Sequence, residues 1–263
     1  MFYSTRRLFR SSDHGWTGSA DSGLSRAADS NPYRLRLRED GRLERYYLVW
    51  NGPFKVQRSL SSDNGKTWSL EEDLFEVKFP EELGFKQLIP SQMLETQSRS
   101  LLWFMWSRPL PEVQVIGGQR YEREVPRARP YVIRSTDQGD TWSGPNDVDH
   151  PWPGNHLNFA KDAINEIYAA QTKKGPILAL IRPSLSPLMW ESWSEDDGQS
   201  WTPAARGPFP MCACEASMIC TTSGVILIGG RFPGIAVQVS RDDGMSWKGY
   251  RIDAVGWANG AMF

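Results

Sequence analysis

An octapeptide that recurs along the chain constrains its fold more than any other feature. The pattern Ser-x-Asp-x-Gly-x-Thr/Ser-Trp begins at Ser61, Ser135, Ser194 and Ser240. A fifth copy begins at Ser11 but carries Gly18 in place of the Trp. Chance recurrence of five specified positions is negligible, and spacings of 46 to 74 residues indicate an array of similar structural units.

Each octapeptide has the composition of a β-hairpin turn. The Asp side chain can accept hydrogen bonds from backbone N–H groups of its own turn, and the Gly supplies a positive φ. Strand-like runs flank the copies, such as YYLVW before the first complete one and IAVQV before the last. Three or four short strands to each repeat predict an all-β propeller. Residues 158–170 alone are expected to form one or two helical turns.

The octapeptide resembles the Asp-box, or BNR, repeat of the sialidase (neuraminidase) superfamily. This resemblance implies a six-bladed sialidase-like β-propeller, in which the repeat joins the third and fourth strands of a blade and points away from the active centre. At about 50 residues a blade, the chain holds about five blades, so residues 1–263 are expected to be a single, incomplete propeller domain.

Two explanations for the incomplete ring stay open. Either the N-terminal strands complete the last blade, or the sequence is a fragment cut within the following blade. Set against the family pattern, the resemblance also implies one whole blade compressed between Trp142 and Glu166.

Two Glu–Arg pairs are the candidate site residues. Glu166 precedes Arg182 by 16 residues, and Glu215 precedes Arg231 by the same number. The first pair resembles a family segment in which the Glu polarises a Tyr nucleophile. Its Arg is one of three that grip the sialic acid carboxylate, which a planar guanidinium matches bidentately. The Cys-Glu-Ala-Ser stretch resembles the segment leading to the third such arginine, here Arg231. A second reading makes Glu215 and Arg231 the family's Glu and Arg.

The chain departs from the family in three places. It lacks the Arg-Ile-Pro stretch of the first arginine, for which Arg34 or Arg36 would be a forced choice. Residues 45–60, where the family has its acid/base Asp, contain neither Asp nor Glu. Tyr250 lies too close to the last octapeptide to match the nucleophile. The resemblance therefore implies a glycoside hydrolase that removes terminal sialic acid or a related sugar, with only part of its machinery visible in this chain.

Two other functions are compatible with the same sequence. A non-catalytic propeller would bind glycans or proteins on its rim through exposed tryptophans. A glycosidase acting on a neutral sugar would keep Glu166 and Arg182 but use another acid, such as Asp162. The candidate tryptophans are Trp103, Trp106, Trp152 and Trp190.

Composition narrows the partners. Lys plus Arg number 30 and Asp plus Glu 31, so the net charge of −1 gives no reason to expect nucleic acid or an anionic membrane. No run approaches the roughly 20 apolar residues of a membrane span. The start MFYSTRRLFR has no apolar signal-peptide core, which favours the cytoplasm or, if the natural N-terminus lies upstream, secretion. Cys212, Cys214 and Cys220 are predicted to be thiols rather than a disulfide framework or a metal site. We expect a carbohydrate partner and no cofactor.

Overall fold

The described part of the chain consists of strands and turns. The computed structural model describes residues 2–4, 7–10, 12–13, 17, 19–20, 34–50, 53–78, 85–109, 112–123, 129–148, 164–183, 188–210, 216–230 and 235–252. These residues contain no helix, and hence none that could cross a membrane. The chain divides into two compact units, Met1–Lys78 and Phe79–Met262, each of which is described by itself.

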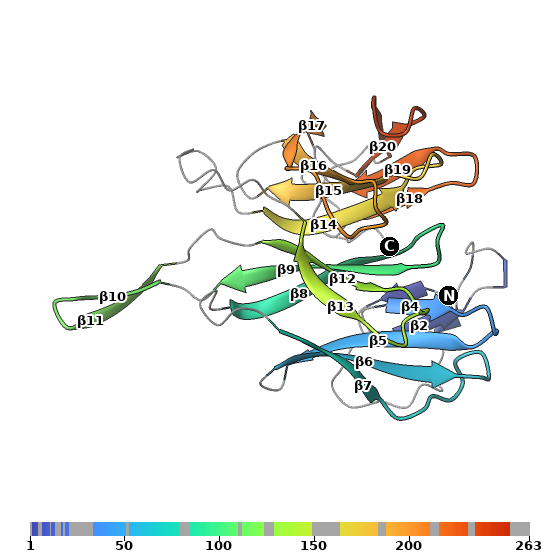
Figure 1. The fold of residues 1–263 in the computed structure, drawn as a ribbon, viewed down its shortest axis with the longest axis horizontal. Coiled ribbons are helices and arrows are strands. Elements are labelled where there is room, and N and C mark those ends of the chain that lie inside the picture. Colours follow the sequence, from blue (N-terminus) through green and yellow to red (C-terminus); the bar gives the residue numbers. More distant parts are fainter. Residues whose placement is uncertain are drawn as a thin grey trace. The chain divides into compact units, whose positions relative to one another are not determined.

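The described residues of the first unit form two antiparallel sheets, and in each of them the strands follow one another in chain order (Figure 1). The smaller sheet has the order β1-β2-β3 and the larger one β4-β5-β6-β7. Their strands are β1 (Phe2–Ser4), β2 (Arg7–Arg10), β3 (Ser19–Ala20), β4 (Arg34–Leu37), β5 (Leu43–Trp50), β6 (Phe54–Ser61) and β7 (Glu72–Val77).

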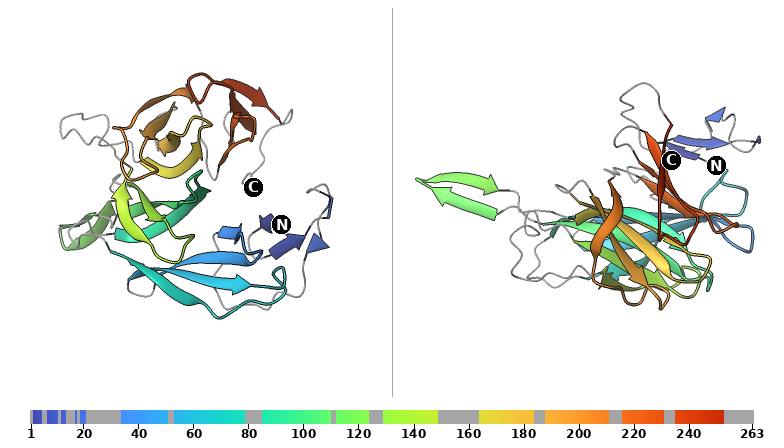
Figure 2. Two further views of the ribbon diagram at one scale, coloured as in Figure 1. Left: turned by 45° about the vertical axis from the view of Figure 1, so that its right-hand side comes forward. Right: turned by 90° about the horizontal axis from the view of Figure 1, so that it is seen from above.

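The second unit contains three four-stranded antiparallel sheets among its described residues. They are β8 (Phe85–Glu95), β9 (Leu101–Pro109), β12 (Pro130–Ser135) and β13 (Ser143–Asp147); β14 (Ile164–Gln171), β15 (Ile177–Pro183), β16 (Leu188–Ser194) and β17 (Ala205–Pro210); and β18 (Ser217–Cys220), β19 (Ile226–Gly230), β20 (Ala236–Ser240) and β21 (Lys248–Arg251). The edge strand β14 contacts β8, β9 and β12 on one side and β18 on the other (Figure 2). The sheets therefore lie side by side with β14–β17 in the middle.

The core alternates between the two faces of the middle sheet. Ile167, Ala169 and Ile181 pack with Leu102 and Phe104 of the preceding sheet. Residues on the opposite face, among them Tyr168 and Leu180, pack with apolar side chains of β18 and β19. Because successive residues of a strand point to opposite faces, both surfaces of this sheet are buried. The run ILALI is continuously apolar for that reason.

The octapeptides form the predicted hairpin turns. In the turn from Ser135 to Trp142, Asp137 Oδ1 accepts the backbone N–H of Thr141 at 2.8 Å, and Asp137 Oδ2 accepts the Thr141 hydroxyl at 2.5 Å. The two central residues, Gln138 and Gly139, have φ of 64° and 92°, as a type I′ turn requires. All four complete copies repeat these Asp contacts, and the degenerate copy repeats them between Asp13 and Thr17.

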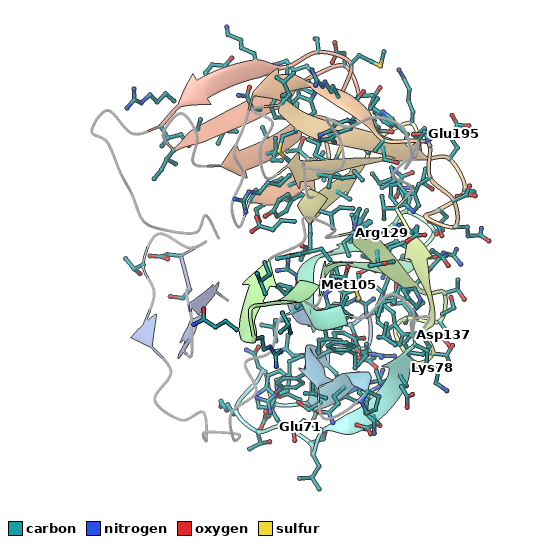
Figure 3. All side chains as sticks on the ribbon, turned by 90° about the vertical axis from the view of Figure 1, so that its left-hand side faces the viewer. Glu71, Lys78, Met105, Arg129, Asp137 and Glu195 are labelled. Carbon is teal, nitrogen blue, oxygen red and sulfur yellow. The ribbon has the colours of Figure 1, made fainter. Side chains whose placement is uncertain are left out.

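Each complete octapeptide joins the third and fourth strands of its sheet, as the resemblance implies. In the second unit two of these turns also pack against the preceding sheet. A Cβ added to Gly198 would lie 2.5 Å from Leu102 Cδ1, and one added to Gly244 would lie 2.8 Å from Leu178 Cδ2. Figure 3 places the turn residues Asp137 and Glu195 at the outside of this unit, away from the buried Met105. The repeat therefore closes hairpins and also fastens neighbouring sheets.

One sequence prediction was wrong. Residues 164–170 belong to strand β14 rather than to helical turns, because both faces of that segment are covered by neighbouring sheets. The prediction of a compressed blade between Trp142 and Glu166 falls on residues 149–163, which lie outside the described residues.

The step of 74 residues from Ser61 to Ser135, between the first two complete octapeptides, is explained by an inserted hairpin. A hairpin of β10 (Glu112–Ile116) and β11 (Gln119–Arg123) is inserted between the second and third strands of the β8–β13 sheet. It projects from that sheet as a separate two-stranded ribbon (Figure 1). Val115 and Ile116 at its turn are 69% and 62% exposed.

Candidate functional site

Glu166 and Arg182 lie at the end of the middle sheet opposite its octapeptide turn. Glu166 is near the start of β14, and Arg182 is the penultimate residue of β15. The octapeptide follows β16, and in an antiparallel sheet the end of the third strand lies beside the start of the second and the end of the first. The two ends of this sheet are thus chemically different, with a structural turn at one and a carboxylate–guanidinium pair at the other.

The pair is joined by direct contacts and includes a third residue. Arg182 Nη1 donates to Glu166 Oε1 at 3.1 Å, and the Tyr168 hydroxyl donates to Glu166 Oε2 at 2.7 Å. The Glu166 and Arg182 side chains are 17% and 21% exposed, whereas Tyr168 is 3% exposed. Both carboxylate oxygens of Glu166 therefore have a protein partner, while the charged groups remain open to solvent on one side. We call these three residues the β14 cluster.

A β-bulge aims Glu166 into this position. Ile164 pairs with Pro183 and Ile167 pairs with Ile181, so Asn165 and Glu166 together lie opposite Arg182. Such a bulge bends the strand and redirects a side chain, which is why bulges are frequent beside functional sites. Glu166 and Tyr168 are two residues apart on β14 and therefore lie on one face, on which Tyr168 packs toward β18.

The β14 cluster can carry out two kinds of chemistry. A carboxylate that accepts a hydrogen bond from a tyrosine hydroxyl makes the hydroxyl oxygen of the tyrosine more electron-rich. A guanidinium has five N–H donors in a fork geometry that matches a carboxylate, and one of those of Arg182 contacts Glu166. The cluster combines a base and an anion-binding group within hydrogen-bond distance of each other.

The other sequence-predicted residues fall into two groups. Glu215 and Arg231 lie outside the described residues, as do Asp162, Trp152, Cys212 and Cys214. Tyr250 lies on β21 and is 44% exposed, with Lys248 Nζ 5.3 Å from its ring centroid. Cys220 is a free thiol at the end of β18, and burial raises its pKa. Among the described residues, no group of three or more His, Cys, Asp or Glu side chains comes together as a metal site.

Arg36 belongs to a buried ion cluster of the first unit and not to an open site. The Glu44 side chain has no exposed surface. Its carboxylate lies 2.9 Å from Nη1 of Arg36, 2.6 Å from Nη1 of Arg38 and 3.4 Å from Nη1 of Arg58. The Tyr46 hydroxyl lies 3.1 Å from the same carboxylate, and burial raises the pKa of Tyr46. We call this set the Glu44 cluster.

The described candidate tryptophans are packed inside the second unit. Trp103 has no exposed surface and lies 6.3 Å, centroid to centroid, from Trp142. Trp190 is 4% exposed and belongs to the core between the first two sheets of the unit. Trp106 is half-buried, and its indole N–H is covered. Neither Trp103 nor Trp190 can stack on a sugar in this packing.

Sequence reasoning missed two residues. Tyr168 falls within residues 158–170, which the sequence predicts as helical turns; in strand β14 its place two residues after Glu166 puts both side chains on one face. Arg108 is the penultimate residue of β9 and pairs with Gln87, just as Arg182 is the penultimate residue of β15. A proline follows each of the two arginines. The repeated Arg-Pro at the end of a second strand was the available signal.

Comparison with known proteins relates the fold to glycoside hydrolases. No protein-family model matches the chain, and no curated protein matches it. Among solved structures, a Hadza microbial sialidase matches with a TM-score of 0.63 at 17% identity, over 94% of this chain and 52% of its own. The NanB sialidase of Streptococcus pneumoniae matches with a TM-score of 0.57 at 15% identity, over 90% and 54% of the two chains.

A Penicillium chrysogenum alpha-L-arabinanase also matches, with a TM-score of 0.60 at 13% identity, over 94% of this chain and 72% of its own. The chain spans about half the length of the two sialidases. At these identities the likeness is one of fold, and the antiparallel sheets of this chain form a propeller-like arrangement of that kind.

Proposed function

We propose that this protein is a sialidase-like glycoside hydrolase, which removes a terminal sialic acid or a related acidic sugar from glycoconjugates. The observation that carries the proposal is the β14 cluster, in which Glu166 contacts both Arg182 and the Tyr168 hydroxyl at the end of the sheet away from the octapeptide turn. The proposal includes a single six-bladed propeller domain over residues 1–263, of which about five blades are present.

Arg182 is assigned to the carboxylate of the sugar. A guanidinium and a carboxylate can form two parallel hydrogen bonds, which fixes the orientation of the ligand as well as its charge. Arg231 is assigned to the same ligand by resemblance, with Glu215 beside it. Arg108 is a further candidate, because it occupies in β9 the place that Arg182 has in β15.

Glu166 is assigned as the base that raises the nucleophilicity of a tyrosine, in a mechanism that retains the anomeric configuration. Tyr168 already donates to Glu166, but only 3% of its surface is exposed. A nucleophile must reach the anomeric carbon, so Tyr168 is better suited to orienting Glu166 than to attacking the sugar. The attacking tyrosine and the acid/base group are not assigned within this chain.

A non-catalytic propeller that binds glycans or proteins is the second candidate. The absence of any Asp or Glu from residues 45–60 favours it, since the family places its acid there. Burial of Trp103 and Trp190 argues against stacking on those rings, and leaves surfaces such as the β10–β11 hairpin as contacts. A hydrolase for neutral sugars is a third candidate, in keeping with the arabinanase neighbour.

Release of the fluorescent aglycone from an aryl sialoside tests the proposal. The variant is Arg182→Ala, and the matched control is Arg134→Ala, which removes another half-buried arginine that pairs with a carboxylate, that of Asp197, at 2.6 Å. The proposal expects turnover by the wild type and by Arg134→Ala, and its loss in Arg182→Ala. A cooperatively folded wild type without turnover favours the binding scaffold. Turnover of aryl glycosides that lack a carboxylate favours the neutral-sugar hydrolase.

A further inference from the structure

A second β-bulge lies in strand β8, and it turns the side chains of Ser91 and Gln92 toward strand β14. Pro90 pairs with Met105 and Met93 pairs with Trp103, so Ser91 and Gln92 together lie opposite one residue of β9. This removes both residues from the regular ladder. Their side chains reach the neighbouring sheet instead of solvent.

The Gln92 carboxamide connects edge strands of all three sheets of the second unit. Its Nε2 donates to the carbonyl of Ala169 on β14 and to that of Met218 on β18, both at 2.8 Å. Its Oε1 accepts the N–H of Ala169 at 3.3 Å. An edge strand leaves a row of backbone groups unpaired. Gln92 supplies partners for such groups on two strands at once.

Ser91 extends this contact to the residue beside Glu166. Its hydroxyl accepts the N–H of Ile167 at 3.3 Å. The side chains of Ser91 and Gln92 thus replace a backbone ladder along the edge of β14, beginning one residue after Glu166. Ala169 and Met218 stand three residues after Glu166 and Glu215 in the sequence, so the same carboxamide donates to the carbonyl three places beyond each candidate glutamate.

We propose that Ser91 and Gln92 are positioning residues, which fix the start of β14, and with it Glu166, relative to β18. The inference rests on the proposed function for its catalytic consequence, although the clamp itself is independent of it. A backbone ladder would hold every residue of this edge in regular register. Hydrogen bonds from the side chains of Ser91 and Gln92 instead allow the backbone of Glu166 to follow the bulge. The arrangement combines a displaced carboxylate with a fixed strand, which accurate placement of a reacting group requires.

Gln97 offers a matched control, because it joins the same two sheets at their other end. Its backbone N–H donates to Gln171 Oε1 at 2.5 Å, and its Nε2 donates to the Thr172 carbonyl at 2.9 Å. Gln97→Met and Gln92→Met make the same change of side chain at inter-sheet contacts. The first removes the bond to Thr172 and keeps the backbone bond to Gln171, whereas the second removes all three bonds of the carboxamide. Gln92→Glu is a milder variant, which keeps the chain length and an acceptor for Ala169 but loses the amide donors.

The test combines kinetics with hydrogen–deuterium exchange on the full chain. In Gln92→Met, kcat on the aryl sialoside is expected to fall by about tenfold to a hundredfold with little change in KM, since a misplacement near 1 Å has that effect. Gln92→Glu should fall between this variant and the wild type, and Gln97→Met should keep the wild-type kcat. Exchange should rise in peptides covering 164–171 and 217–220 in Gln92→Met, but not at 164–168 in Gln97→Met.

Two outcomes overturn the inference, and a third concerns the proposed function alone. Wild-type exchange over 164–171 and 217–220 in both Gln92 variants contradicts the clamp, and so does an equal loss of kcat in Gln92→Met and Gln97→Met. A wild type without turnover removes the catalytic assignment, while the exchange measurement still decides whether Gln92 holds the two strands.

Discussion

The Glu44 cluster and the β14 cluster contain the same residue types but differ in burial and in balance of charge. Both have a glutamate followed two residues later by a tyrosine that donates to it, and both pair the glutamate with arginine. Glu44 is wholly buried and contacts the guanidinium groups of three arginines, whereas Glu166 is partly exposed and contacts that of Arg182. The three arginines of the Glu44 cluster carry more positive charge than Glu44 balances, and Arg58 also pairs with Glu72, whose carboxylate lies 2.7 Å from Arg58 Nη2.

This difference separates a structural ion cluster from a candidate site. A buried carboxylate is tolerable only when its partners are complete, so the Glu44 cluster has no capacity for a ligand. In the β14 cluster the charged groups are partly exposed, so a sugar carboxylate can compete with Glu166 for Arg182. Residue type alone would have made Arg36 and Arg182 equally good candidates.

The largest expected effect on stability follows removal of the buried carboxylate. Glu44→Ala should lower the free energy of unfolding by about 3–5 kcal/mol, because it leaves three buried guanidinium groups without their common partner. Urea unfolding followed by tryptophan fluorescence measures the loss. A loss below about 1 kcal/mol would mean that the Glu44 cluster contributes no more than ordinary surface ion pairs, which would contradict its difference from the β14 cluster.

A smaller effect is expected at the turn that fastens two sheets. Gly198→Ala places a Cβ 2.5 Å from Leu102 Cδ1 at a residue with φ of +83°. Overpacking and left-handed strain together should cost about 2–4 kcal/mol. The thermal midpoint should fall while aryl sialoside turnover at low temperature stays unchanged, since the turn lies at the end of the sheet away from Glu166. An unchanged midpoint would mean that Leu102 moves aside freely.

Removal of a single hydroxyl sharpens the comparison further. Tyr168→Phe deletes the donor to Glu166 Oε2 at the cost of about 1–2 kcal/mol, in line with a hydrogen bond to a charged group. We expect a larger fractional loss in kcat than in stability, because Glu166 loses its orientation. A variant with wild-type kcat would show that Tyr168 does not orient Glu166.

Glu166→Gln should lower the free energy of unfolding by less than about 1 kcal/mol, and so by less than Glu44→Ala, because the ion pair of Glu166 is partly exposed. Its effect on turnover should be large, since the amide is neither charged nor basic. Parallel unfolding and kinetic measurements with Glu44→Ala test the contrast directly. Equal destabilisation by the two substitutions would contradict it.

Acid should weaken the octapeptide turns before the fold as a whole. The pKa of Asp137 is lowered: burial raises it, but hydrogen bonds from Thr141 and Ser135 outweigh burial. A carboxylate whose pKa is lowered by folding stabilises the folded chain above its ordinary value near 3.9, and that contribution is lost as the pH falls through the folded value. Stability should therefore decline below about pH 4, and less steeply in Thr141→Ala. An identical slope in the two proteins would contradict this origin.

The sequence predicted the turns well because their interactions are local. Asp137 contacts Thr141 and Gly139 contacts Ser135, each four residues apart, so local composition determines the hairpin. The assignment of Glu166 and Arg182 came from a resemblance, and their contact depends on a bulge that no periodicity reveals. Ser91 and Gln92 could not be found, because their partners lie more than 70 residues away in the chain. The place of Arg36 in an ion cluster could not be predicted, because the burial of Glu44 is a tertiary property.

Binding of free sialic acid, measured by isothermal titration calorimetry, tests the central claim most directly. The account predicts that the wild type and Arg134→Ala bind the sugar acid, and that Arg182→Ala loses binding while remaining folded. Equal binding by the wild type and Arg182→Ala, or no binding by a folded wild type, would contradict the assignment of the β14 cluster as the site of an acidic sugar.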